Sequence, residues 1–178
     1  MKELVRQLIV QQLEIFKHCG DDRQPQARPP ISAPSLTKLD TLFAEHGGAI
    51  PPSYRAFLQV SDGIDDFSFS YHLFGSKELL SPAYSALRAE VLDSGVGLSR
   101  EPEARLILIG HHPETTTRLF IDLQHEPLEL DESVILDGDP GDISLHPSFV
   151  AFMRMRVTAN EITIAKLIAV REGKLDDA

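Results

Sequence analysis

The segment Ile50–Gly63, IPPSYRAFLQVSDG, constrains the fold of this chain more than any other stretch. Its two prolines suit the first turn of a helix, where backbone N–H groups have no intrahelical partner. Tyr54, Phe57 and Leu58 follow at helical spacing, which places them on one face. Gly63 can adopt the left-handed backbone conformation that ends a helix. The segment therefore predicts a short capped helix that buries one face in a core.

Helical periodicity also predicts elements before this segment. Residues 1–20 contain an apolar helical stripe that ends at Gly20, a residue type that stops helices. Residues 21–34 are rich in proline and polar side chains and predict a linker or surface loop. Ser35 is the predicted N-cap of a second helix. Because an apolar stripe must be buried, we expect the first helix to dock on the rest of the chain or on a second subunit.

Strands and further helices are predicted after Gly63. Residues 67–73 alternate apolar with polar side chains and predict one strand with a buried face. An antiparallel strand pair is predicted from residues 105–109 with 117–123, and a further strand pair from residues 128–130 with 133–136, followed by a turn over 137–142. Helices are predicted to begin at Ser81-Pro82, over residues 145–149 and at a capping box over Thr158–Glu161.

These elements divide the chain into four segments. Residues 1–20 are the N-terminal helix and residues 21–34 the linker. Residues 35–157 form the main domain, and residues 158–178 form a C-terminal helix and tail.

The Ile50–Gly63 segment resembles the signature of the SMI1/KNR4 superfamily, also called SUKH. That signature is a Leu-Pro-x-x-Tyr-x-x-Phe-Leu run that leads to Asn-Gly. Here isoleucine replaces the first leucine and Asp62 replaces the asparagine. Further matches to the family follow in the same order along the chain, at Phe74-Gly75, Ile109-Gly110, Asp122, Ser148-Phe149 and Phe152-Met153. The resemblance covers residues 36–157.

The resemblance implies an α+β fold with a largely antiparallel sheet flanked by helices. Many bacterial SUKH proteins are immunity proteins that neutralise a cognate toxin, often a nuclease, by direct binding. The best-known fungal members are regulatory proteins. Neither role requires catalysis, so the resemblance implies no enzymatic activity and no cofactor.

The charge distribution favours a basic protein partner. The chain has a formal net charge of −10, and residues 61–142 carry 17 acidic and 5 basic side chains. We call residues 61–142 the acidic block. Nucleic-acid binding is disfavoured because phosphate contacts need a basic surface. A basic protein would be attracted and steered by the opposite field. The alternative is a solvated surface that serves only solubility.

Cysteine content and hydropathy indicate the compartment. The single cysteine, Cys19, excludes an internal disulfide and multi-cysteine metal motifs. No apolar run approaches the roughly 20 residues that span a bilayer, and the N-terminus lacks the uninterrupted apolar segment of a signal peptide. We therefore expect a cytoplasmic protein that is not in a membrane.

Motifs for chemistry are weak in this sequence. His111 and His112 are adjacent, so in a strand they point to opposite faces and do not easily share a metal ion. In a turn they could share one, but no third ligand stands at metal-site spacing. The DGDPGD run at 137–142 resembles the start of a calcium loop, but Ser148 stands where that loop needs glutamate. Neither a Gly-x-Ser-x-Gly elbow nor a glycine-rich phosphate loop is present.

These observations lead to three hypotheses. The first is a non-enzymatic protein-binding module, similar to SUKH immunity proteins, that neutralises a toxin. Asp62, Asp65 and Asp66 would form one edge of its contact surface, and the Tyr54 hydroxyl would reach either the partner or the 62–63 turn. The second is a regulatory or scaffold domain that binds a housekeeping partner, with the terminal helices forming a homodimer. The third is an enzyme or metal protein built on the adjacent histidines and nearby acids.

Overall fold

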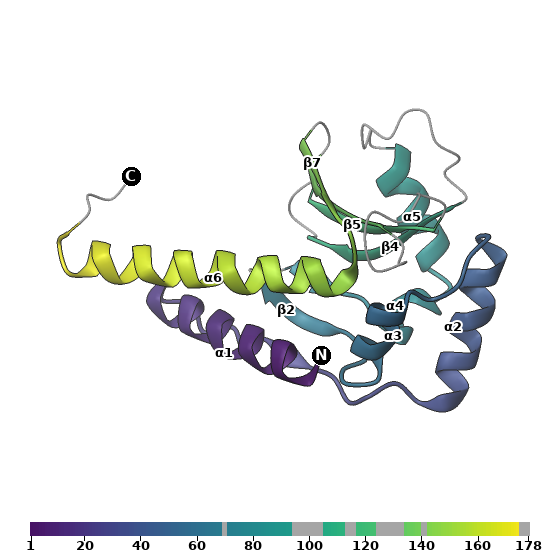
Figure 1. Ribbon diagram of the computed structural model, residues 1–178, viewed down its shortest axis with the longest axis horizontal. Helices are drawn as coiled ribbons and strands as arrows, with labels where there is room; N and C mark the ends of the chain where they lie inside the picture. Colours follow the sequence, from purple (N-terminus) through teal and green to yellow (C-terminus); the bar gives the residue numbers. More distant parts are fainter. Residues whose placement is uncertain (69–70, 94–104, 113–116, 124–133, 140–141, 175–178) are drawn as a thin grey trace.

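The computed structural model describes residues 1–68, 71–93, 105–112, 117–123, 134–139 and 142–174 (Figure 1). Its helices are α1 (Lys2–His18), α2 (Ala33–Glu45), α3 (Pro52–Leu58), α4 (Ser76–Leu79), α5 (Tyr84–Asp93) and α6 (Phe149–Arg171). Its strands are β1 (Gln26–Ala27), β2 (Ile64–Ser68), β3 (Tyr71–Leu73), β4 (Leu106–His111), β5 (Arg118–Asp122), β6 (Val134–Asp139) and β7 (Asp142–His146).

The strands of the described residues form one seven-stranded sheet in the order of the chain. Each strand pairs antiparallel with the next. The predicted α+β fold, with an antiparallel sheet flanked by helices, is confirmed. The hairpin predicted from 105–109 and 117–123 is β4 and β5, which pair from Leu106 opposite Asp122 to His111 opposite Arg118. The strand predicted at 128–130 lies outside the described residues.

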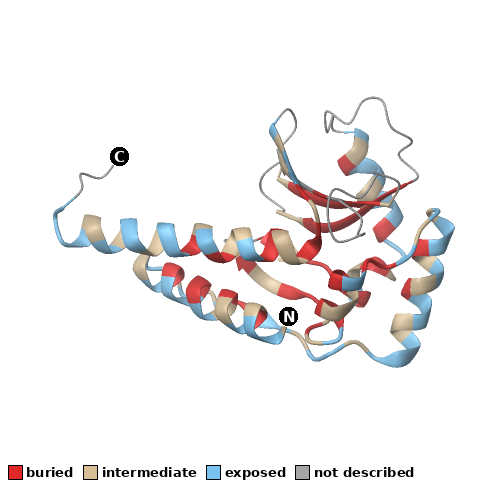
Figure 2. Cartoon of the chain, in the orientation of Figure 1, coloured by how far each residue is buried: buried red, intermediate tan, exposed pale blue. Residues whose placement is uncertain are grey.

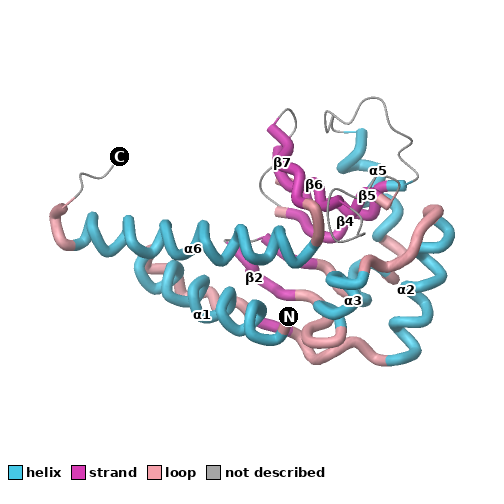
Figure 3. The backbone as a smooth tube through the Cα atoms, in the orientation of Figure 1, coloured by secondary structure: helices cyan, strands magenta, loops and turns pink. Residues whose placement is uncertain are grey.

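The helices stand at two ends of this sheet. Figures 1 and 3 show α1 and α6 side by side at one end of the molecule, with α2 to α5 gathered toward the other end. α1 and α6 run in the same direction, as two sets of contacts show. Gln7 and Gln11 Nε2 donate to Glu161 Oε1 at 3.3 and 3.4 Å. Further along, the C-terminal ends of both helices line one groove. Within the described residues, no helix has the length and apolar content to cross a membrane.

The predicted helix over the signature segment is confirmed as α3. Tyr54, Phe57 and Leu58 are buried. The rings of Tyr54 and Phe57 each lie with centroids 5.1 Å from that of Phe149 at the start of α6. Figure 2 shows this buried region joining α3 to the central strands. The helix therefore connects the two ends of the fold through aromatic packing.

The single strand predicted over residues 67–73 is wrong. The chain forms two strands here, and Ser68 of β2 pairs with Tyr71 of β3. Phe67, Tyr71 and Leu73 are all buried, as the alternation predicts. A two-residue connection preserves the alternation, so the pattern does not reveal that the chain reverses. Phe69 lies outside the described residues.

The boundary at the linker also needs correction. α2 begins at Ala33, and its N-cap is Ser32 rather than Ser35. Ser32 Oγ accepts a hydrogen bond from Ser35 N at 3.2 Å. The helix can begin before Pro34, because proline fits within the first helical turn. The linker contains β1, in which Gln26 pairs with Asp65. Residues 21–34 are therefore partly built into the sheet.

The helix break predicted at 158–161 is wrong. α6 begins after Ser148, whose Oγ accepts from Ala151 N at 3.1 Å, and continues without interruption to Arg171. The capping-box residue types at Thr158–Glu161 lie in the helix interior. They do not act as a cap because both flanking turns are already helical and supported by packing. The boundary drawn between residues 157 and 158 therefore falls inside one helix.

Two other predictions agree with the structure in part. The helix predicted from Ser81-Pro82 is α5, which begins three residues after Ser81 and buries Tyr84 and Val91. The turn predicted over 137–142 is narrower, because β6 extends to Asp139 and β7 begins at Asp142. Residues 140–141 are outside the described residues.

Candidate functional site

The predicted contact segment is not a single loop, because Asp62 lies in the turn between α3 and β2 whereas Asp65 and Asp66 belong to β2. Gly63 lies in this turn with φ +98°, and a Cβ there would stand 2.8 Å from the Leu73 carbonyl oxygen. The turn therefore needs glycine for both its backbone conformation and its space. Ser61 Oγ donates to the Gly63 carbonyl at 2.6 Å, which holds the turn against the core.

Asp62 is committed to an internal role. One carboxylate oxygen accepts a hydrogen bond from Ser76 N at 2.6 Å, and the other accepts from Ser76 Oγ. Asp62 thus satisfies the start of α4 in the way that an N-cap side chain does. The approach is close, because a Cβ on Gly75 would lie 2.2 Å from the Asp62 carbonyl oxygen. Both carboxylate oxygens of Asp62 therefore accept hydrogen bonds within the fold, and its place in the contact edge stays a prediction.

Asp65 is held by an arginine from the linker. Arg28 Nε and Nη2 donate to the two Asp65 oxygens at 3.0 and 2.5 Å, and Arg28 Nη1 donates to Glu78 Oε2 at 2.6 Å. We call these three residues the Arg28 clamp. Hydrogen bonds from Arg28 lower the pKa of Asp65, and the same bonds raise the pKa of Arg28. The clamp ties the residue after β1 to β2 and α4. It could not be predicted from the sequence, because the two carboxylates lie 37 and 50 positions from Arg28 along the chain.

Asp66 is the most available of the predicted acids. Its backbone has φ +50°, a conformation that aspartate tolerates better than most residues. Its N–H donates to His72 Nδ1 at 3.4 Å. Its side chain is half-buried, and no described residue donates a hydrogen bond to its carboxylate.

The predicted role of the Tyr54 hydroxyl in partner contact is wrong. Tyr54 is 1% exposed, and its hydroxyl donates to the Phe74 carbonyl oxygen at 2.8 Å. Burial raises the pKa of the Tyr54 phenol. The hydroxyl thus reaches the end of β3 rather than a partner or the 62–63 turn.

Other acids of the acidic block divide into internal and surface groups. Asp122 is buried and forms an ion pair with Arg105, with Nε to Oδ1 at 3.0 Å and Nη2 to Oδ2 at 3.0 Å. Asp137 lies 3.8 Å from His146 Nε2. The acids that are exposed within the described part of the block are Glu90, Asp93 and Asp142. Seven of the 17 acids lie outside the described residues.

Three histidines, His72, His111 and His112, lie close to where β3 pairs with β4 inside the sheet. His72 pairs with His111 across the strands, and His72 Nδ1 lies 3.7 Å from Asp65 Oδ1. The pKa of His111 is lowered to about 4, first by burial and then, in decreasing order, by the nearby Arg118, His112 and His72. The described residues contain no group of three His, Cys, Asp or Glu side chains placed to hold a metal ion.

A small pocket that the sequence did not predict lies where α6 meets the sheet. It has a volume of about 220 Å³. Arg156 Nη2 donates to Ser68 Oγ at 2.8 Å, and its guanidinium lies 5.8 Å from the centre of the Phe67 ring. His112 and Asp137 also line the pocket. It combines aromatic walls with both signs of charge.

No protein-family model matches the chain, and a search of curated proteins returned no match.

Proposed function

We propose that this protein is a non-enzymatic protein-binding module that acts in the cytoplasm and neutralises a basic protein, in the manner of the SUKH immunity proteins that its sequence resembles. The acidic block is the observation that carries this proposal, since residues 61–142 hold 17 acidic and 5 basic side chains. The antiparallel α+β fold is compatible with the resemblance.

The mechanism is occlusion by complementary charge. A nuclease presents Lys and Arg to the phosphates of its substrate. An acidic inhibitor can occupy the same basic surface through charge-assisted hydrogen bonds, which are stronger than neutral ones. Its field also accelerates the encounter with an oppositely charged partner. No bond needs to be made or broken, and no cofactor takes part.

The contact edge centres on Asp66. Its carboxylate has no hydrogen-bond donor among the described residues, so an incoming Lys or Arg meets an acceptor that is not already committed. Asp65 provides a second acceptor beside it, because 36% of its side chain remains exposed although it is bound in the Arg28 clamp. A carboxylate that already accepts two hydrogen bonds retains lone pairs for a third.

The test is capture of partners from the protein's own cell extract at low and at moderate salt. Wild-type protein should retain a basic, toxin-like protein at low salt and release it as salt rises, because salt screens exposed charges. Asp66→Lys should retain much less of it. The matched control is Glu45→Lys, which makes the same charge change at an exposed position on α2, outside the acidic block.

Two outcomes would contradict the proposal. One is a captured protein whose retention does not depend on salt, which would support a regulatory domain bound to a housekeeping complex instead. The other is equal loss of the partner in Asp66→Lys and Glu45→Lys, which would reduce the effect to net charge alone.

A further inference from the structure

The two terminal helices expose most of the large apolar side chains on the described surface. We define the terminal helix pair as α1 together with residues 158–171 of α6. Of the five exposed large apolar residues in the described chain, four lie on this pair. They are Val10 (54% exposed), Leu13 (46%), Ile162 (53%) and Ile168 (38%). Exposed large apolar side chains are therefore concentrated on this pair within the described molecule.

The end of α6 has the composition of a buried helix. Residues 162–170 read ITIAKLIAV, with lysine as the single charged side chain. Yet among the described residues of α6, none after Asn160 is buried. In Figure 1 this part of the helix extends past the sheet and beyond the end of α1. A helix that is apolar around its circumference is normally enclosed by other elements, so these turns have more apolar surface than the single chain covers.

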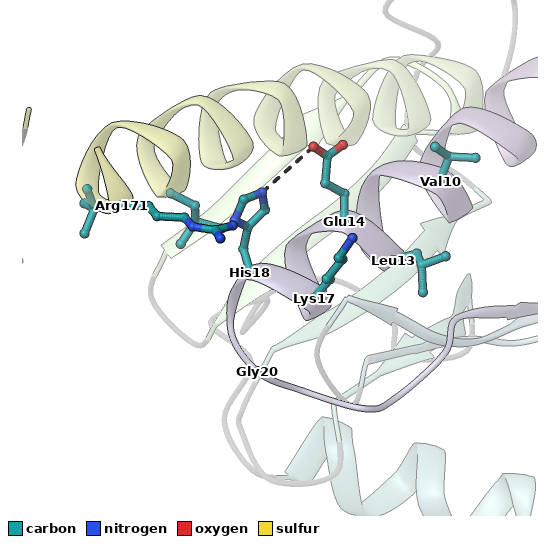
Figure 4. Close-up of a pocket in the computed structure, with 9 residues that line it drawn as sticks. Val10, Leu13, Glu14, Lys17, His18, Gly20 and Arg171 are labelled. Carbon is teal, nitrogen blue, oxygen red and sulfur yellow. Dashed lines mark ion pairs between the residues drawn. The ribbon is translucent and has the colours of Figure 1, made fainter. Parts of the chain in front are cut away.

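A groove runs between the two helices at this end (Figure 4), with a volume of about 900 Å³. Val10, Leu13, Leu167 and Val170 form its apolar lining. Charged side chains of both signs surround them, namely Glu14, Lys17 and Arg171, and His18 also lines the groove. Glu14 Oε1 lies 3.9 Å from His18 Nε2 within α1.

The mixture of charges identifies the occupant. We propose that the terminal helix pair binds a second copy of this chain, so that two pairs form a symmetric four-helix contact. In a two-fold contact, the same patch of each copy faces the other, so each contact between two different residues occurs twice. A patch that carries both positive and negative side chains can therefore pair with itself. Glu14 of one copy then pairs with Lys17 of the other, and Leu13 packs into the apolar centre. A uniformly basic partner would instead meet Lys17 and Arg171.

This interface is separate from the acidic contact edge. It is built from α1 and α6, whereas the proposed contact edge, Asp65 and Asp66, lies on β2. A dimer would therefore present two acidic surfaces. Failure of either proposal leaves the other intact, since one depends on apolar burial and the other on Asp66.

The first test is the mass of the full chain in solution, measured by light scattering after gel filtration over a range of concentrations. The wild type should show twice the chain mass of 19.8 kDa. Leu13→Glu should raise the dissociation constant of the dimer at least about tenfold, because it places a charge in a buried apolar contact. Leu145→Glu is the matched control, because Leu145 is 53% exposed on β7, and its dimer should be unchanged.

The second test asks whether the partner is another copy. Glu14→Lys should weaken the dimer, and adding Lys17→Glu should restore it, because the double exchange re-creates the complementary pairs. Circular dichroism should show equal helix content in all variants, since the exchanged side chains are exposed. A monomer at every concentration, a dimer unaffected by Leu13→Glu, or a double variant as weak as Glu14→Lys would overturn the proposal.

Discussion

Asp62, Asp65 and Asp66 lie within five positions, and each carboxylate has different surroundings. Asp62 accepts from Ser76, Asp65 accepts from Arg28, and Asp66 has no donor among the described residues. The sequence predicts negative charge at this turn. It does not predict which carboxylate is available, because the partners come from distant segments that only the folded chain brings together.

The Tyr54 hydroxyl provides a residue-scale prediction. Tyr54→Phe should lower the free energy of unfolding by about 1–2 kcal/mol, because it leaves the Phe74 carbonyl without its donor in a buried site. Denaturant unfolding measures this change. Partner capture should be the same as for the wild type, and reduced capture by a folded Tyr54→Phe protein would contradict the core position of the ring.

His111 gives a prediction for pH. Its folded pKa of about 4 lies below the value of about 6.5 for an unfolded histidine, so between these values the unfolded chain binds more protons. The contribution of His111 to stability is therefore fully present above about pH 6.5 and is lost as pH falls toward 4. His111→Gln should unfold with a smaller pH dependence across this window. An unchanged dependence would show that His111 titrates normally in the fold.

At the scale of the element, short helices with local signals are predictable. α3 is specified by its prolines, its apolar spacing and Gly63, all within 14 residues. α6 is not, because the capping-box pattern at 158–161 is local evidence for a helix start, whereas packing against α1 continues the helix through it. The reversal between β2 and β3 was missed for a similar reason, since alternation is the same in one strand and in a tight hairpin.

The continuity of α6 predicts a contrast between two substitutions. Ser148→Ala should cost about 1 kcal/mol, because Ser148 Oγ caps the helix. Thr158→Ala should change stability by less than about 0.5 kcal/mol or raise it slightly, since alanine is the better residue in a helix interior. Thermal unfolding of both variants measures the contrast. A cost for Thr158→Ala equal to that of Ser148→Ala would indicate a separate helix beginning at residue 158.

The Arg28 clamp predicts how the linker is attached. Arg28→Ala should destabilise the protein by about 2–4 kcal/mol, because it removes charge-assisted hydrogen bonds and leaves two carboxylates without their cation. Hydrogen exchange should accelerate most in β1. Arg6→Ala is the control, since Arg6 and Glu3 form an ion pair with both side chains well exposed, and its effect should be much smaller. Equal effects would mean that the clamp adds little to the fold.

At the scale of the whole molecule, the sheet joins its strands in chain order and leaves surfaces of different character. The turn after α3 and the start of β2 carry three acids, whereas the terminal helix pair is apolar with mixed charge. Composition predicts the acidic excess, because it depends only on counting. The exposed apolar surface of α6 could not be predicted in the same way, because an apolar helix is read from sequence as core unless its neighbours in space are known.

The proposed function depends on electrostatic recognition through Asp66. The most direct test is the dissociation constant of the captured partner, measured at several salt concentrations for wild type, Asp66→Lys and Glu45→Lys. We expect wild-type affinity to fall steadily as salt rises, and we expect Asp66→Lys to bind at least about tenfold more weakly at low salt while Glu45→Lys remains close to wild type. Salt-independent affinity, with all three proteins binding equally, would contradict the claim.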